Sequence, residues 1–262
     1  MSRIDRKFKE LKKINKKAFI AFVTAGFPSL SVTEKLIYEL DRIGVDILEL
    51  GVPFSDPMAD GPVIQEASQE ALRKNTHLVD ILKLVKKARK DVNMPICLMT
   101  YYNPIFCFPE KQFIAKAKES GVDGLIVPDL PPEEGKSFVQ AAKTAGLDTI
   151  FFLSPTSSVK RIKLVSKVSS GFIYYISLTG VTGERRELSG DIRKNINLIK
   201  QYTRKPVCVG FGVSTPGQAR EIRSFSDGVI IGSAIVKKIK ENLGSASLVK
   251  KVSDFVKRLK AG

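Results

Sequence analysis

Short runs of apolar and largely β-branched residues recur along this chain, and their number constrains the fold more than any other feature. Segments with helical periodicity separate them, and strands that alternate with helices are typical of parallel βαβ units. We predict eight strands, at residues 18–24, 46–50, 96–100, 124–127, 149–153, 172–177, 207–209 and 228–231. Eight such units in 262 residues predict a single α/β domain, residues 1–262, folded as a closed (β/α)8 TIM barrel.

The segments between these runs carry further fold signals. Helical periodicity is found at residues 31–43, 78–90, 110–120, 133–145, 159–167, 192–202 and 215–223, and an amphipathic segment at 3–17 predicts an additional N-terminal helix before the first strand. Gly44, Gly121 and Gly146 each precede a strand and follow a helical segment. Glycine is the preferred residue just past a helix end, so these joints mark the amino end of the barrel.

The segment LELGVPFSDPMADGPVIQ, residues 48–65, places two acids where chemistry is expected. Glu49 lies in an apolar strand, and Asp60 follows eleven residues later on a loop stiffened by prolines. A lone carboxylate in a buried strand is costly without a partner or a task. Active residues of such barrels lie where strands end, so Glu49 and Asp60 are candidates for two carboxylates of different environment acting on one small molecule.

Other acids on these loops have competing interpretations. Asp60 alternatively serves as a turn residue before Gly61, and for Asp56 the turn is the favoured interpretation. Asp129, between prolines, either holds its loop or contacts the substrate. Tyr174 and Tyr175 end the sixth strand, and alternation allows only one to point inward. Phe22, in the first strand, either lines a pocket or fills the barrel.

Glycines at the ends of the last strands favour a phosphate site. Gly210 and Gly212 follow the seventh strand, and Gly232 with Ser233 follows the eighth. Glycine lets the backbone approach a ligand closely, and helix N-termini supply N–H donors. Phosphate sites in this position recur across barrel enzymes, although each glycine alone is compatible with a simple turn.

Charge and composition narrow the function classes. The net charge is +16, and residues 3–17 and 237–260 each hold eight basic and two acidic side chains. We interpret these as solvated faces of terminal helices, because Phe8 and Phe255 belong to the apolar faces of these helices and do not form a nucleic-acid stacking platform among the basic residues. Nucleic-acid binding is therefore not expected. No apolar run reaches eighteen residues, so membrane binding is not expected either. Cys97 and Cys208 lie in apolar runs as core residues, no cysteine has metal-ligand spacing, and a reduced cytoplasm fits.

Taken in order, the motifs FVTAGFP, ILELGVPFSDPMADGPVIQ, YYNPI, GVDGLIVPDLPPEE, GVTGER, VGFGVS and DGVIIGSAIV resemble those of tryptophan synthase alpha chains over essentially the whole length. The resemblance implies a lyase that cleaves indole-3-glycerol phosphate to indole and glyceraldehyde 3-phosphate. This retro-aldol step needs protonation of indole C3, loss of the indole N–H proton and deprotonation of the glycerol hydroxyl.

The resemblance also implies site residues. Glu49 matches the general acid/base, Asp60 the carboxylate that faces the indole nitrogen, and Tyr174 an active-site tyrosine. A carboxylate flanked by apolar residues is expected to have a raised pKa, as a proton shuttle requires. The substrate-binding positions implied in the same way are Phe22, Met99 and Val127 around the indole, Thr182 closing over Asp60, and Gly183, Gly212, Gly232 and Ser233 around the phosphate.

The partner and cofactor follow from the same resemblance. The family forms an α2β2 complex in which the beta chain uses pyridoxal phosphate to join indole to serine, so no cofactor is expected in this chain. Residues 53–60 and 102–106 match surfaces that face the beta chain. Three alternatives stay open: another phosphate-binding barrel such as an indole-glycerol-phosphate synthase or a sugar-phosphate isomerase, a catalytically weak allosteric partner, and nucleic-acid binding through the basic ends.

Overall fold

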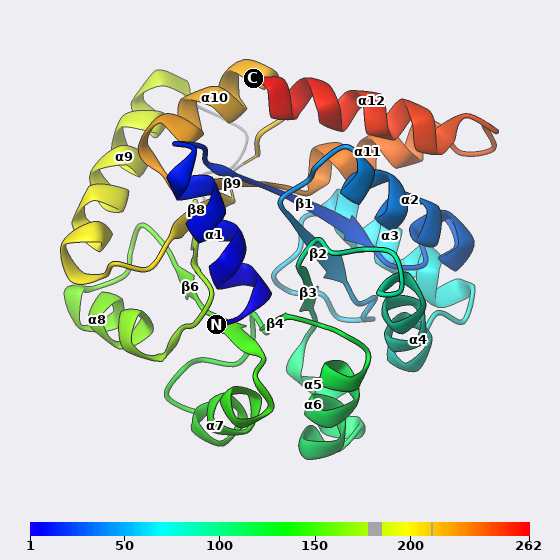
Figure 1. The fold of residues 1–262 in the computed structure, drawn as a ribbon, viewed down its shortest axis with the longest axis horizontal. Helices are drawn as coiled ribbons and strands as arrows, with labels where there is room; N and C mark the ends of the chain where they lie inside the picture. The colour runs from blue at the N-terminus through cyan, green and yellow to red at the C-terminus, as the bar shows by residue number, and fades with distance from the viewer. Residues whose placement is uncertain (178–184, 211) are drawn as a thin grey trace.

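A computed structural model describes residues 1–177, 185–210 and 212–262, and within these ranges nine parallel strands form one sheet. The strands are β1 (Ala18–Thr24), β2 (Ile47–Gly51), β3 (Ile96–Met99), β4 (Gly124–Ile126), β5 (Asp148–Ile150), β6 (Phe152–Leu153), β7 (Ile173–Ile176), β8 (Val207–Gly210) and β9 (Gly228–Ile231). Hydrogen-bonded neighbours follow the order β5-β4-β3-β2-β1-β9-β8-β7-β6 (Figure 1). The predicted barrel is confirmed.

The fifth predicted strand differs from its prediction. Residues 149–153 were expected as one strand, but the structure has two pieces separated by Phe151. β5 pairs only with β4, whereas β6 pairs only with β7. The two edges of the sheet therefore belong to consecutive residues, so nine strands fill eight positions around the barrel and the chain itself completes the ring.

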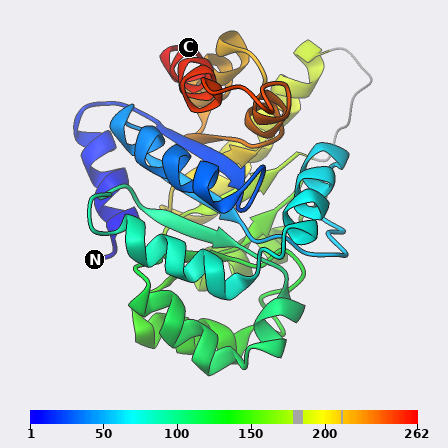
Figure 2. The same ribbon diagram turned by 90° about the vertical axis from the view of Figure 1, so that its right-hand side faces the viewer.

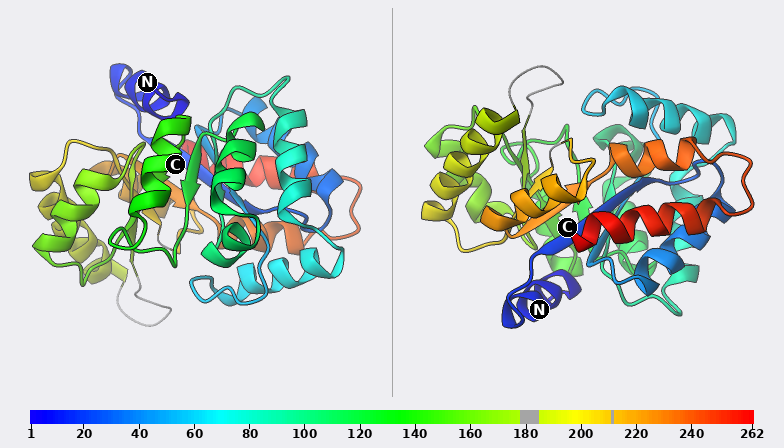
Figure 3. Two further views of the ribbon diagram at one scale, coloured as in Figure 1. Left: turned by 90° about the horizontal axis from the view of Figure 1, so that it is seen from below. Right: turned by 90° about the horizontal axis from the view of Figure 1, so that it is seen from above.

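Helices surround this sheet on all sides (Figures 2 and 3). They are α1 (Arg3–Lys13), α2 (Leu30–Arg42), α3 (Pro62–Arg73), α4 (Leu78–Ala88), α5 (Tyr102–Cys107), α6 (Glu110–Glu119), α7 (Lys136–Ala145), α8 (Val159–Val168), α9 (Arg185–Tyr202), α10 (Pro216–Phe225), α11 (Ser233–Lys240) and α12 (Leu248–Ala261). The sequence did not predict α3 and α5, α7 begins at residue 136 rather than 133, and α9 begins at 185 rather than 192. The terminal helix expected within 237–260 is two helices, α11 and α12. No helix in the described part of the chain is long and apolar enough to span a bilayer.

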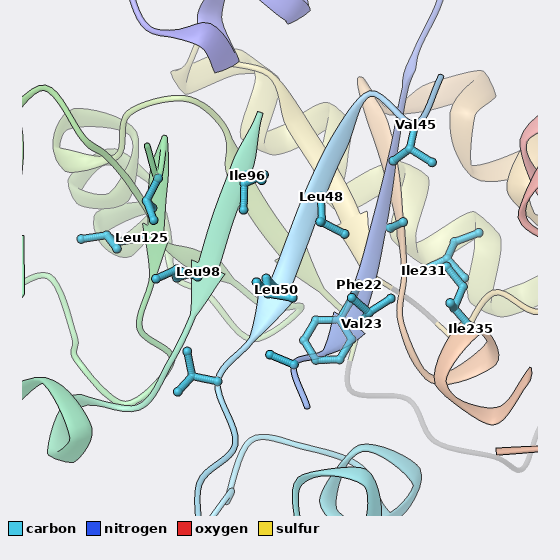
Figure 4. Packing of buried hydrophobic residues seen from close by; sticks show 14 of the residues in the cluster. Phe22, Val23, Val45, Leu48, Leu50, Ile96, Leu98, Leu125, Ile231 and Ile235 are labelled. Carbon is cyan, nitrogen blue, oxygen red and sulfur yellow. The ribbon is translucent and has the colours of Figure 1, made fainter. Parts of the chain in front are cut away.

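Strand alternation divides the buried side chains into two layers. Leu48, Leu50 and Leu98 pack outward against the helices (Figure 4). A second cluster fills the barrel interior and comprises Ile4, Leu11, Ala18, Ile20, Ile47, Cys97, Ile126, Ile150, Phe172, Cys208 and Ile230. Cys97 and Cys208 are fully buried there, so their interpretation as core residues is confirmed.

The N-terminal helix α1 closes the amino end of the barrel. Its Ile4 is fully buried in the interior cluster, and a Cβ at Gly124 or Gly171 would lie 3.0 or 3.2 Å from Ile4 atoms. Arg3 forms an ion pair with Asp123 at 2.9 Å, just before β4 begins. α1 and α3 lie at opposite ends of the strands (Figure 2), so the carboxyl end is left for chemistry.

The glycine joints at this amino end behave as predicted. Gly44, Gly121 and Gly146 have φ values of 75°, 87° and 71°, in the left-handed region that favours glycine. Each of their amides bonds a carbonyl of the preceding helix. These three residues therefore end helices and turn the chain into β2, β4 and β5.

Candidate active site

Glu49 projects into the barrel from the middle of β2. In the parallel register it pairs with Phe22 of β1 and Cys97 of β3, and its side chain is completely buried. Neither carboxylate oxygen has a hydrogen-bond partner among the described residues. Burial, followed by the negative charge of Asp60, raises the pKa of Glu49 from 4.5 to about 8. The predicted elevation of this pKa is therefore present, and Glu49 is neutral at pH 7.

Asp60 lies at the end of the β2–α3 connection, next to Gly61, which caps α3. The hydroxyl of Tyr101 donates to Asp60 Oδ2 at 3.1 Å, and the side-chain amide of Gln65 donates to the backbone carbonyl of Asp60 at 2.8 Å. Burial raises the pKa of Asp60 to about 6, and the bond from Tyr101 opposes that rise. At pH 7 Asp60 is ionised while Glu49 holds a proton, so the fully buried acid is neutral and the partly exposed acid is charged.

Tyr174 is the inward-facing member of its pair. Its ring lies 4.8 Å from the Phe152 ring, and it packs with the interior cluster, whereas Tyr175 belongs to the outer cluster. A Cβ at Gly210 would stand 2.5 Å from Tyr174 Cε1, so this glycine makes room for the ring. Burial and the charges of Glu49 and Asp60 hold the pKa of Tyr174 well above 10. Tyr174 therefore stays protonated beside the two acids.

The apolar residues assigned to the pocket divide into two groups. Phe22 is 4% exposed, and a Cβ at Gly51 would meet its ring at 2.5 Å, so Phe22 lies beside β2 inside the barrel. Met99 faces inward next to its register partner Ile126. Val127 corrects the prediction: Ile126, the last residue of β4, packs in the interior cluster, so strand alternation turns the next residue away from the interior. Ile126 occupies the position expected of Val127.

The predicted phosphate cradle is described in part. Gly232 caps α11, its carbonyl accepts from the amides of Ile235 and Val236, and Ser233 is exposed at the first helical position. The first-turn amides of a helix have no helical carbonyl to bind, which suits an anion. Gly212 is exposed, and apart from its chain neighbours no atom of the described residues lies within 4 Å of a Cβ built on it. Thr182 and Gly183 lie outside the described residues.

The ambiguous acids have structural partners. Asp129 accepts hydrogen bonds from the backbone N–H of Tyr102 at 2.9 and 3.1 Å, so it holds the β3–α5 loop. Asp56 is exposed and accepts from Ser55 at 2.5 Å, in keeping with a turn. Within the described ranges no group of three or more His, Cys, Asp or Glu side chains could hold a metal ion.

Two residues near the acids were not singled out from the sequence. Tyr101 bonds directly to Asp60, and Thr24 at the end of β1 is 1% exposed with its hydroxyl oxygen unpartnered among the described residues. Thr24 pairs with Gly51, two residues beyond Glu49. Strand-end position was the only signal available for either residue.

Cavity size alone does not identify this site. A cavity of about 340 Å³ opens at the carboxyl end beside Ala59, Asp129, Phe152 and Ile176, but neither Glu49 nor Asp60 lines it. Three larger cavities, of about 980, 720 and 450 Å³, lie against α1, and neither acid lines any of them. The chemical groups at the carboxyl end, rather than the volume, therefore mark the candidate active site.

Comparison with known proteins adds independent information. A family model described as tryptophan synthase alpha chain matches residues 8–262. The tryptophan synthase alpha chain of Geotalea uraniireducens is 49% identical over 262 residues, covering 100% of this chain and 98% of that protein. A crystal structure of tryptophan synthase subunit alpha from Legionella pneumophila superimposes with a TM-score of 0.93 at 35% identity, covering 100% and 98%. A chain of the tryptophan synthase complex from Pyrococcus furiosus gives 0.85 at 34% identity, covering 94% and 98%.

Proposed function

The chain belongs to the tryptophan synthase alpha chain family, and we propose how its own residues carry out the cleavage of indole-3-glycerol phosphate to indole and glyceraldehyde 3-phosphate. The reaction breaks the bond between indole C3 and the first glycerol carbon. The enzyme is thus a carbon–carbon lyase of tryptophan biosynthesis.

Glu49 is the proton shuttle of this proposal. Its neutral carboxyl donates a proton to indole C3, and the resulting carboxylate accepts the proton of the glycerol hydroxyl. As the C3–carbon bond breaks, its electron pair returns to the indole ring and the hydroxyl carbon becomes the aldehyde. The proton lost to C3 is replaced by the hydroxyl proton, so Glu49 ends the cycle neutral. A pKa of about 8 supports this role, because the acid carries its proton at neutral pH.

Asp60 faces the indole nitrogen in this proposal. Protonation at C3 places positive charge on the ring nitrogen, and a nearby carboxylate stabilises that charge in a site with little water. Asp60, with a pKa of about 6, is ionised at pH 7 and thus supplies the charge. Tyr174, Phe22, Met99 and Ile126 would surround the indole ring.

The substrate phosphate is assigned to the carboxyl ends of β8 and β9. The first turn of α11, beginning at Ser233, offers backbone N–H groups, and the exposed Gly212 leaves space beside it. We extend this cradle to Gly183, and to Thr182 as a residue that closes over Asp60, from the resemblance alone. The phosphate and indole ends of the substrate would then span the barrel mouth.

The enzyme works with a tryptophan synthase beta chain in an α2β2 complex. Met58 is 81% exposed and Phe106 is 69% exposed, and both lie in the segments matched to the partner-facing surface. Exposed apolar side chains of this kind favour a protein interface. We place pyridoxal phosphate on the beta chain and none on this chain. All three cysteines are unpaired, in keeping with a cytoplasmic enzyme.

The observation that carries the proposal is the pair of acids in one barrel: Glu49, fully buried in β2 and unpartnered among the described residues, and Asp60, held by Tyr101 on the connection that follows β2. The test is indole release from indole-3-glycerol phosphate by the purified chain, alone and with its beta chain. We expect release that rises on adding the beta chain. Absence of release in both conditions, with a beta chain that is shown to bind, would overturn the catalytic assignment.

A further inference from the structure

Tyr101 connects two loops at the carboxyl end of the barrel. It follows β3, caps α5 at its N-terminus and is 3% exposed. Its ring stacks on that of Phe54, in the β2–α3 connection, with centroids 5.2 Å apart and an interplanar angle of 29°. The ring therefore holds the β3–α5 junction against the connection that carries Asp60.

The hydroxyl of Tyr101 makes two hydrogen bonds to that connection. It accepts from the backbone N–H of Ala59 at 2.9 Å and donates to Asp60 Oδ2 at 3.1 Å. A phenol has one proton, so once the amide occupies a lone pair the proton is directed at the carboxylate. This is the one hydrogen bond that the described residues make to the Asp60 carboxylate.

From this geometry we infer that Tyr101 is a positioning residue, which keeps Asp60 ionised and orients its carboxylate toward the substrate. The inference rests on the proposed function, because it concerns the charge that Asp60 presents to the indole nitrogen. Tyr101 acts through Asp60 rather than on the substrate. The proposed roles of Glu49 and Asp60 in cleavage do not by themselves give Tyr101 a role.

Electrostatics at the site agree with this role. Burial alone would raise the pKa of Asp60, and the bond from Tyr101 lowers it, since a donated hydrogen bond stabilises the charged form. Burial and the Asp60 charge hold the pKa of Tyr101 far above 10. The phenol therefore remains a protonated donor across any pH at which the enzyme is assayed.

The test compares Tyr101→Phe with the wild type in the complex with the beta chain, by the pH dependence of kcat/KM for indole release. The variant keeps the ring on Phe54 but removes the donor. A hydrogen bond to a charged group is worth enough to move the acid limb of the profile upward by about one pH unit. The alkaline limb should stay in place. Tyr175→Phe is the matched control, because it removes a buried hydroxyl that accepts from Asn195 at 3.0 Å on the outer face.

A second variant keeps the inference testable if Tyr101→Phe unfolds. Fluorotyrosine at position 101 retains the hydroxyl and makes it a stronger donor, so the acid limb should move to lower pH. Carbon-13 titration of the Asp60 carboxyl reports the same shifts without catalysis. The inference would be overturned if neither substitution at position 101 changed the pKa of Asp60 or the position of the acid limb of kcat/KM. If the Asp60 titration shifts as expected but the wild type itself releases no indole, the result would instead count against the proposed function.

Discussion

Glu49→Gln should produce an enzyme that is inactive yet more stable than the wild type at neutral pH. Glu49 is fully buried, and its oxygens lack partners among the described residues. In the unfolded chain the carboxyl ionises with its ordinary pKa of 4.5, whereas in the folded protein the pKa is about 8. The folded state therefore binds more protons between these values, and the wild type loses stability as pH rises through this window.

The magnitude follows from the two pKa values. Each pH unit between them costs about 1.4 kcal/mol, which amounts to about 3.5 kcal/mol between pH 5 and pH 8 for this group. Glutamine has nearly the same shape but no proton to gain, so the variant lacks this term. The difference in free energy of unfolding between Glu49→Gln and wild type should thus grow by about 3 to 4 kcal/mol over that range.

The assay is urea denaturation of both proteins at several pH values from 5 to 8, with indole release measured on the same samples. Glu221→Gln serves as the control, since Glu221 is exposed and its carboxyl stays in water on folding. We expect loss of indole release by a factor of about 10² or more, with beta-chain binding retained. A stability difference that does not change with pH would refute the buried, protonated state of Glu49. Near-normal turnover would refute its catalytic role.

Three further substitutions test other parts of the structure. Asp60→Asn should lower kcat about 100-fold or more without lowering Tm, because it removes the charge opposite the indole nitrogen, and steady-state kinetics with thermal melting check this. Gly210→Ala places a Cβ 2.5 Å from the Tyr174 ring, so urea titration should show a loss of about 1–3 kcal/mol together with reduced kcat/KM. Arg89→Met leaves Asp123 without its 2.5 Å partner in the barrel floor, which should cost about 3–5 kcal/mol at pH 7. We expect the folded Arg89→Met protein to keep its kcat/KM, because the Arg89–Asp123 ion pair lies away from the reacting groups. A free energy of unfolding equal to that of the wild type would contradict the pairing.

The sequence predicted the barrel because each strand carries its own local signal. An apolar run marks every unit, glycine joints mark three of them, and seven of the eight predicted strands appear as single strands. The fifth predicted strand is two strands in the structure, because its two halves pair with different neighbours, β4 and β7. The break at Phe151 has no local sequence signature. α3 was missed because it follows a loop rich in proline and glycine, although Pro62 at its first turn favours a helix start.

Residue types that are anomalous in their setting supplied the site candidates, whereas positions that depend on geometry alone gave no such signal. Glu49 and Asp60 were proposed because acids in an apolar or stiffened setting are unusual. Val127 was misassigned because a one-residue error in register exchanges the two faces of a strand. Tyr101 was overlooked because its bond to Asp60 spans 41 residues, and no periodicity reports a contact of that range.

Buried acids at the two ends of this barrel show how the fold separates stability from chemistry. Asp123 at the amino end has a side chain only 5% exposed, and it is matched by Arg89 at 2.5 Å, Arg3 at 2.9 Å and the backbone N–H of Ile96. Glu49 is buried more completely but lacks any such partner among the described residues. Two guanidinium groups and a backbone N–H balance the Asp123 carboxylate, whereas no cation lies beside Glu49 among the described residues, and its burial favours the protonated form. The absence of partners around Glu49 is thus what makes its proton available at neutral pH, and adding a cation beside it would stabilise the anion at the expense of the reaction.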